Sequence, residues 1–372
     1  MTQALRAGGV ATILAGLLFS YMYTADPHPT RWLFLWGAVF GFALFCRVSF
    51  DKLTCWVLVF VGYAALSLLW TPDWRQGIMS FNILALLSFL FIALRQTSHD
   101  WLRLVVPWGA AVCILVSAMQ PPETYGGMRN ENFHAEFICL LIPLALMGWD
   151  RIEGYIPALM AASATVTLVI ENLSDAKWMG LAGALGFGLL YLWRRGYRAP
   201  LLCAPVLAGA ALWLIWPAVR LAVLRRVELS YDTLLMWLDR PVFGIGIGGF
   251  DYLYPFYQER HPNLIDGNTI NQVHIYAGAT HNEYVQALAI FGMAGFAILC
   301  AIAWHCRKTQ NTHAFVAVSV MAGLASVNFP MQNPSTAILG VIALALSVGP
   351  VAGVSRLAER QGGAGRTALQ AG

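Results

Sequence analysis

Residues able to do phosphate and acid–base chemistry gather in one polar segment, about residues 218–283, of an otherwise apolar chain. The segment contains three arginines, Arg220, Arg225 and Arg226, and ends near the tetrad His281-Asn-Glu-Tyr284. The planar guanidinium group of arginine binds two phosphate oxygens at once and stays charged at any working pH. A histidine, whose ordinary pKa is about 6.5, can accept the proton of a hydroxyl nucleophile. The segment therefore suits an anionic substrate, and His281 is a candidate for acid–base chemistry.

The composition places this segment in a membrane protein. Apolar residues make up 58% of the 372 residues and charged residues 11%, against about 25% charged in a soluble domain. Because a spanning helix needs about 20 apolar residues and can use as few as ~17, we predict an all-α polytopic protein with about twelve transmembrane helices. The predicted spans are residues 7–24, 32–50, 53–71, 77–95, 101–119, 134–149, 155–172, 178–194, 199–217, 284–304, 314–330 and 335–353.

The distribution of positive charge predicts the orientation. If the amino terminus lies in the cytoplasm, the short loops on the outer side contain only Arg31, Arg75, Arg129 and Lys177 among the 23 Lys and Arg residues of the chain. Cytoplasmic loops carry the excess of Lys and Arg. We therefore expect one transmembrane domain over residues 1–353 with both termini cytoplasmic. Residues 218–283 then form a long periplasmic loop between helices 9 and 10, and residues 354–372 form a disordered cytoplasmic tail.

On this topology, other polar segments reach the same membrane face as His281. The loop before the sixth span contains Arg129 and Asn132, and the turn after the seventh contains Lys177. Cations clustered beside a membrane suit a lipid-linked phosphate or diphosphate. Ionisable residues avoid the middle of the predicted spans, which counts against an ion-coupled carrier because intramembrane charges mark ion paths.

The order and spacing of these segments resemble the O-antigen ligase superfamily of membrane glycosyltransferases. That group includes O-antigen ligases, polysaccharide polymerases and bacterial O-oligosaccharyltransferases. Its signature is an arginine about fifteen residues before Pro-x-x-Gly-x-Gly, then His-Asn-(Glu)-Tyr leading into a helix with Phe-Gly-x-x-Gly. The matching residues here are Arg226, Pro241, Gly244, Gly246, His281, Phe291 and Gly295. Ser230 stands where the family often has a tryptophan, four residues after the arginine, which leaves Arg225 as a rival to Arg226.

The resemblance implies a GT-C-like fold and glycan transfer from an undecaprenyl-diphosphate carrier to an acceptor hydroxyl in the periplasm, as in lipopolysaccharide biosynthesis at a bacterial inner membrane. It implies no cofactor. The sequence contains no Asp-x-Asp pair of the kind that holds a metal in many glycosyltransferases. We therefore expect metal-independent transfer, with inversion at the anomeric carbon. The resemblance assigns catalysis to His281, diphosphate binding to Arg226, Arg225, Lys177 and Arg129, and substrate positioning to Asn132, Asn282, Tyr284, Gly244 and Gly246.

Alternatives remain open at this point. The acceptor is lipid A–core, a growing glycan in a polymerase, or a protein hydroxyl, and the same cations would also serve a glycolipid flippase or export component. His281 could be a surface residue, the arginines interface anchors, and Asn132 a turn or cap residue of the sixth helix. The glycines from Gly244 to Gly249 are read as a backbone bend, and Tyr252, Tyr254, Phe256 and Tyr257 as an interfacial aromatic belt. The seven cysteines are read as buried hydrophobes, because they show no metal-binding spacing.

Overall fold

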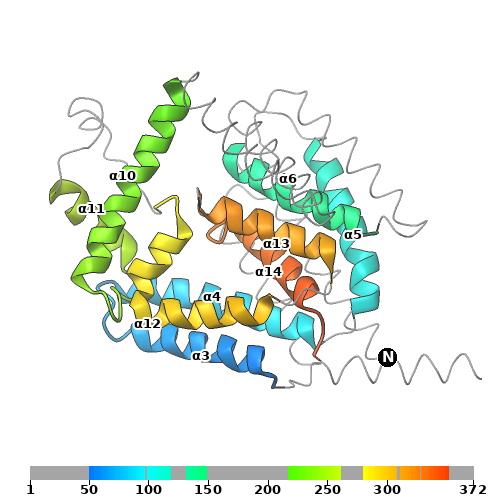
Figure 1. Ribbon diagram of the computed structural model, residues 1–372, viewed down its shortest axis with the longest axis horizontal. Coiled ribbons are helices and arrows are strands. Elements are labelled where there is room, and N and C mark those ends of the chain that lie inside the picture. Colours follow the sequence, from blue (N-terminus) through cyan, green and yellow to red (C-terminus); the bar gives the residue numbers. More distant parts are fainter. Residues whose placement is uncertain are drawn as a thin grey trace, which may run out of the picture.

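The computed structural model describes residues 50–96, 99–118, 131–148, 217–260, 280–307, 311–326 and 328–351, and these ranges are helical without strands (Figure 1). This confirms the predicted all-α class for the described part of the chain. The predicted spans 7–24, 155–172 and 178–194, and all but the last residue of 32–50 and 199–217, lie outside the described residues. The number of spanning helices stays a prediction. The helices are α3 (Lys52–Ser67), α4 (Trp74–Arg95), α5 (His99–Ala118), α6 (Glu131–Ala145) followed by the 3₁₀ turn η2 (Leu146–Gly148), α10 (Pro217–Asp239), α11 (Phe250–Arg260), α12 (Glu283–Cys306), α13 (Thr312–Ala325) and α14 (Pro334–Val348).

Two helices of the described part, α4 and α12, are long and apolar enough to cross a membrane. Only 22% of the apolar window of α12 is buried, and most of its residues are partly exposed within the described part of the chain. The helix α13 ends at Ala325, earlier than the predicted span 314–330. The chain then forms a loop that enters the site described below. Residues 217–239, at the start of the predicted periplasmic loop, form the helix α10.

The centre of the helical assembly is α14, which contacts α4, α6, α12 and α13 (Figure 1). Almost every residue from Pro334 to Ser347 is buried. A helix that is apolar on all sides is stable only when neighbours surround it. Asn333 caps its first turn by accepting a hydrogen bond from the Ser335 amide, and Pro334 occupies the first helical position, where no donor is needed.

A partly buried ion pair joins the ends of three helices on the side away from the candidate site. Arg95, at the end of α4, donates to both oxygens of Asp51 at 3.0 and 2.6 Å. Asp51 is also the N-cap of α3. The Arg95 carbonyl accepts from the Val351 amide at 3.0 Å, just beyond α14. This arrangement makes α3 and α4 antiparallel neighbours.

A kink in α12 joins two of the sequence motifs into one structural unit. Gly292 has φ 61°, which interrupts the helix and leaves nearby backbone groups without helical partners. The segment 241–246 supplies those partners. The Ile245 and Gly246 amides donate to the Ala289 and Ile290 carbonyls at 2.9 and 3.0 Å, and the Met293 and Ala294 amides donate to the Pro241 and Val242 carbonyls at 2.9 and 3.0 Å. Irregular backbone in a membrane protein is tolerated where protein groups satisfy it in this way.

This close approach explains why the Pro-x-x-Gly-x-Gly segment needs glycines. Gly244, Gly246 and Gly248 have φ of 70°, 89° and 78°, so the predicted backbone bend is confirmed. A Cβ atom on Gly244 would lie 2.4 Å from the Ile290 carbonyl oxygen, and one on Gly292 would lie 2.3 Å from the Val242 carbonyl oxygen. Glycine is therefore required by both conformation and contact at the kink.

Replacing Gly244 with alanine is expected to lower the free energy of unfolding by about 2 kcal/mol or more, because it adds steric overlap to an unfavourable positive φ. The matched control is Gly62→Ala in α3, where an added Cβ meets nothing within 4 Å. That change is expected to be neutral or to stabilise by up to about 1 kcal/mol through helix propensity. The measurement is the thermal unfolding midpoint of both variants in detergent, and equal midpoints would show that the kink is not tightly packed.

Candidate functional site

The backbone at His281 is held in an unusual conformation by its neighbours. His281 has φ 54°, the one positive φ among the described residues other than glycine, and such a conformation costs of order 1–3 kcal/mol. Thr280 fixes the turn, since its hydroxyl donates to the Asn282 carbonyl at 2.6 Å and accepts from the Asn282 amide at 3.0 Å. Asn282 caps α12 by accepting from the Tyr284 and Val285 amides at 3.1 Å. Asn282 therefore positions the histidine through the helix that it begins.

The imidazole ring of His281 is fixed from the loop that follows α13. Its Nδ1 lies 2.9 Å from Oδ1 of Asn328. The ring of Phe329 meets it edge-on, with ring centroids 4.9 Å apart. Both contacts come from a segment far from His281 in the sequence. The ring is thus held by a hydrogen bond on one side and an aromatic contact on another.

Two charged side chains from other helices complete the cluster. Asn328 donates through Nδ2 to Oε1 of Glu136 in α6, whose side chain is fully buried. Arg226, half-buried in α10, interacts electrostatically with both Glu136 and His281. Burial lowers the pKa of His281 below its ordinary value of 6.5 and the positive charge of Arg226 lowers it further, while the hydrogen bond with Asn328 acts in the opposite sense. The lowered pKa favours the neutral imidazole, which is the form that accepts a proton.

A second carboxylate anchors the loop after α13 to α12. Oε1 of Glu283 accepts from the Met331 amide at 2.7 Å. The Tyr284 hydroxyl donates to the Ala322 carbonyl of α13 at 2.8 Å. Gln286 reaches the same region, because its Oε1 accepts from the Thr280 amide at 3.3 Å and from Nε2 of Gln332 at 3.2 Å. These contacts keep the segment carrying Asn328 against the residue it orients.

The predicted site residues lie at different places in the structure. His281, in the turn before α12, and Arg226, in α10, lie close enough to interact electrostatically. Gly244 and Gly246 lie at the kink of α12, and Tyr284 bonds α13. Asn132 lies in the first turn of α6, which starts one residue before it. Arg129, Lys177 and the side chains of Asn132 and Arg225 lie outside the described part.

Glu136 and Asn328 belong to the site but were not among the predicted site residues. A carboxylate near the start of a predicted span is a usable signal, since an ionisable group in such a segment marks function by default. Asn328 gives a weaker signal, because asparagine is common in turns. What places both beside His281 is the packing of α6 and α13 on α14, which sequence spacing does not encode.

A cavity of about 330 Å³ opens beside this cluster, between the start of α4, the segment 247–251 and the first turns of α12. Its walls combine apolar side chains with polar ones, and it shares Gln286, Met331 and Gln332 with the neighbourhood of His281. Asp251 lines it and accepts from Nε2 of Gln76 at 3.4 Å. Partial desolvation, followed by repulsion from Asp73, raises the pKa of Asp251 to about 6. A pocket of this kind suits a ligand with hydroxyl groups and one apolar face.

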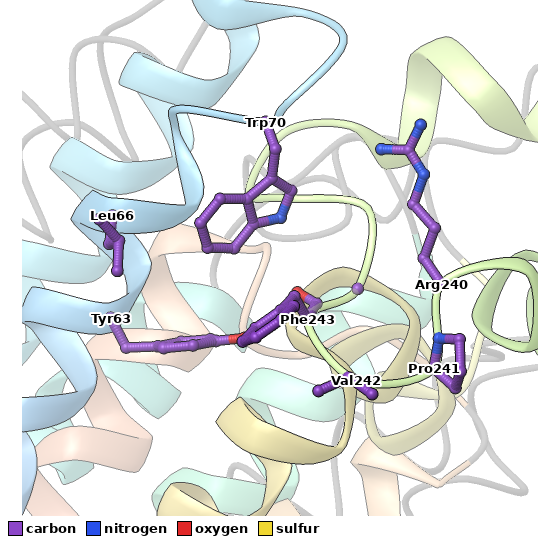
Figure 2. A pocket seen from close by; sticks show the side chains of 8 residues that line it. Tyr63, Leu66, Trp70, Arg240, Pro241, Val242 and Phe243 are labelled. Atoms are coloured by element: carbon purple, nitrogen blue, oxygen red, sulfur yellow. The ribbon is translucent and has the colours of Figure 1, made fainter.

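A larger cavity, of about 710 Å³, lies at the C-terminal end of α10. Figure 2 shows Tyr63, Leu66 and Trp70 on one side, Arg240 and Pro241 on the other, and the ring of Phe243 between them. Arg240 is fourteen residues beyond Arg226, or about 20 Å along a helix that rises about 1.5 Å per residue. The walls of this larger cavity are almost wholly apolar, so it suits an apolar chain. The cavity is separate from the His281 cluster.

A scan of the chain against protein-family models finds no match, and a search of curated proteins finds none either. Within the described ranges, no three His, Cys, Asp or Glu side chains are grouped so that they could hold a metal ion.

Proposed function

We propose that this chain is a membrane glycosyltransferase that moves a glycan from a polyprenyl-diphosphate carrier, such as undecaprenyl diphosphate, to an acceptor hydroxyl on the periplasmic side of a bacterial inner membrane. The observation that carries the proposal is the pairing of a positioned histidine with a half-buried arginine, where the middle of α10 meets the N-terminal parts of α6 and α12. The histidine suits the activation of a hydroxyl, and the arginine suits a diphosphate leaving group. The resemblance of the motifs to the O-antigen ligase superfamily supports the same assignment.

The chemistry divides between the two residues. The His281 ring takes the proton of the acceptor hydroxyl as that oxygen attacks the anomeric carbon of the glycan. The bond to the diphosphate breaks on the opposite face, so the anomeric configuration inverts. Arg226 stabilises the negative charge that the leaving diphosphate gains, and its partial burial strengthens this interaction because the local dielectric is low. Lys177, Arg129 and Arg225 are further candidates to bind the diphosphate.

The cavity beside His281 suits the acceptor. Its mixed walls match a sugar ring, which presents hydroxyls at its rim and an apolar face. Gln286 links the cavity to the catalytic turn through the Thr280 amide. We therefore place a carbohydrate acceptor there, as in ligation to lipid A–core or in glycan polymerisation.

We expect the rate of transfer to fall as the pH is lowered. The midpoint of this acid limb should lie below about 6.5, the ordinary pKa of histidine. The sign follows from the lowered pKa of His281: the neutral base is present above that pKa and is lost as the pH falls through it. The measurement is kcat/KM for the free enzyme against pH. Asp251 titrates near 6, so the profile is repeated with Asp251→Asn, and an acid limb that disappears in this variant would not belong to His281.

The proposal is tested with purified protein in lipid nanodiscs, a carrier-diphosphate glycan, candidate acceptors and EDTA. We expect glycosylated acceptor to form with EDTA present, and NMR of the product to show an inverted anomeric centre. Lipid A–core, carrier-linked glycan and protein acceptors are compared, and the one that reacts identifies the ligase, polymerase or oligosaccharyltransferase activity. Binding of the carrier lipid without transfer to any acceptor would contradict the proposal and favour a flippase or export component. Transfer only without EDTA would contradict metal independence.

A further inference from the structure

The amide of Asn328 has a defined orientation, because one of its ends is fixed by Glu136. Nδ2 of Asn328 donates to Oε1 of Glu136. A carboxyl oxygen in this position accepts whether or not Oε2 carries a proton, and Oε2 has no hydrogen-bond partner among the described residues. With its NH₂ group turned toward Glu136, the amide must turn its oxygen the other way. That oxygen lies 2.9 Å from Nδ1 of His281.

A carbonyl oxygen accepts hydrogen bonds but cannot donate, so Nδ1 of His281 must carry the hydrogen. A neutral imidazole has a single N–H, which leaves Nε2 with a free lone pair. We propose that Glu136 and Asn328 are positioning residues that hold neutral His281 as the Nδ1–H tautomer, so that Nε2 is the atom that takes the acceptor's proton. The role of Nε2 rests on the proposed function, whereas the tautomer does not.

The surroundings favour a single arrangement of these three side chains. Glu136 and Asn328 are 0% and 2% exposed, so water does not compete for their hydrogen bonds, and such bonds are stronger at low dielectric. Phe329, the residue after Asn328, contacts the imidazole edge-on and restricts its rotation. The groups come from α6, from the loop after α13 and from the turn before α12. Titratable groups face the cluster from α6 (Glu136), α10 (Arg226) and α12 (Glu283).

The proton and electron balance of the step is simple. The hydroxyl proton moves to Nε2, the hydroxyl oxygen bonds the anomeric carbon, and the electron pair of the broken carbon–oxygen bond leaves with the diphosphate. The resulting imidazolium keeps its Nδ1–H bond to Asn328, and the proton on Nε2 later passes to solvent. Glu136 takes no proton in this scheme. It acts on His281 only by orienting the amide between them.

The tautomer is measured by ¹⁵N NMR on histidine-labelled protein above the pKa of His281, without any glycan substrate. The chain has eight histidines, and the His281 signals are assigned by their loss in His281→Gln. We expect the proton on Nδ1 in the wild-type protein, and a mixture of tautomers or the Nε2–H form in Asn328→Leu. A wild-type spectrum with the proton on Nε2 would overturn the proposal, whether or not the variant folds.

Kinetics provide the second readout. Asn328→Leu is expected to lower kcat by about 10²-fold or more with little change in KM, within the range that general-base catalysis contributes. Asn328→Asp keeps the acceptor and adds negative charge, so it is expected to retain more activity and to move the acid limb to higher pH. Glu136→Gln keeps an oxygen for Asn328 and is expected to retain more activity than Glu136→Leu. If Asn328 had only a structural role, Asn328→Asp would not shift the acid limb of the pH profile.

The control is Ser319→Ala, which removes a hydroxyl whose partner among the described residues is the Phe315 carbonyl of the same helix, at 2.9 Å. Wild-type kcat in both Asn328→Leu and Glu136→Leu would overturn the positioning role while leaving the proposed function intact. Failure of transfer in the wild-type protein would overturn the proposed function, and the NMR spectrum would still decide the tautomer. The two proposals therefore fail separately.

Discussion

Replacing His281 with alanine is expected to lower kcat for glycan transfer by about 10²–10⁴-fold, because the acceptor hydroxyl loses its general base. Binding of the carrier lipid should change little, since the diphosphate contacts are assigned to cations. The measurement is single-turnover transfer with saturating donor, together with a separate determination of the Kd for the carrier lipid. Loss of rate without loss of donor affinity would separate proton transfer from substrate binding.

The matched control for this prediction is His305→Ala. His305 lies in the last turn of α12, at the opposite end of the helix that His281 precedes. His305 has the same residue type as His281 but lies outside the cluster, so its replacement should leave transfer unchanged. Near-wild-type transfer by a folded His281→Ala protein would rule out the base assignment.

Replacing Arg226 with alanine is the other change with a large expected effect. Its guanidinium group is assigned to the diphosphate, and a hydrogen bond to a charged group is worth about 1.5–3 kcal/mol, so we expect transfer to fall by about 10- to 100-fold or more. The loss should exceed the loss of donor binding, because negative charge on the leaving group is greatest in the transition state. Arg226→Lys keeps the charge but loses the planar fork, so its transfer rate should lie between those of the wild-type protein and Arg226→Ala.

Arg225→Ala is the matched control for Arg226, and it also decides between the two adjacent arginines. The interactions of Arg226 with Glu136 and His281 favour Arg226. A second signature comes from the pH profile. Because Arg226 lowers the pKa of His281, its removal should shift the acid limb of kcat/KM to higher pH. A larger loss in Arg225→Ala, or an unmoved limb in Arg226→Ala, would exclude Arg226 from the assigned place.

The helical class and much of the helix placement could be predicted from composition and apolar runs, as α4 and α12 illustrate. Helix ends were less predictable. The chain leaves α13 at Ala325, ahead of Pro330, which cannot continue a helix, and hydrogen bonds of Asn328 and Glu283 then hold the loop. Tyr254 was expected in an aromatic belt, but it is buried against Phe250 with ring centroids 5.2 Å apart. Hydropathy records the apolar character of such a residue and not the surface against which it packs.

The candidate site was partly predictable for a similar reason. His281 and Arg226 stand out as polar residues in motif positions, so their types and spacing were informative. Glu136 and Asn328 are informative only once α6 and α13 are packed together. The glycines of the segment after α10 illustrate the reverse case. Their spacing was visible in the sequence, but their structural role, to let segment 241–246 complete the backbone of a kinked α12, depends on a partner about fifty residues away.

The most direct test of the central claim is to measure the release of carrier diphosphate during transfer by the purified wild-type protein. The donor carries separate labels on its lipid and on its glycan, and both products are counted with EDTA present. We predict one free polyprenyl diphosphate for each glycan joined to the acceptor, with neither product formed by His281→Ala. Movement of intact donor between membrane leaflets without release of free carrier would contradict the glycosyltransferase account.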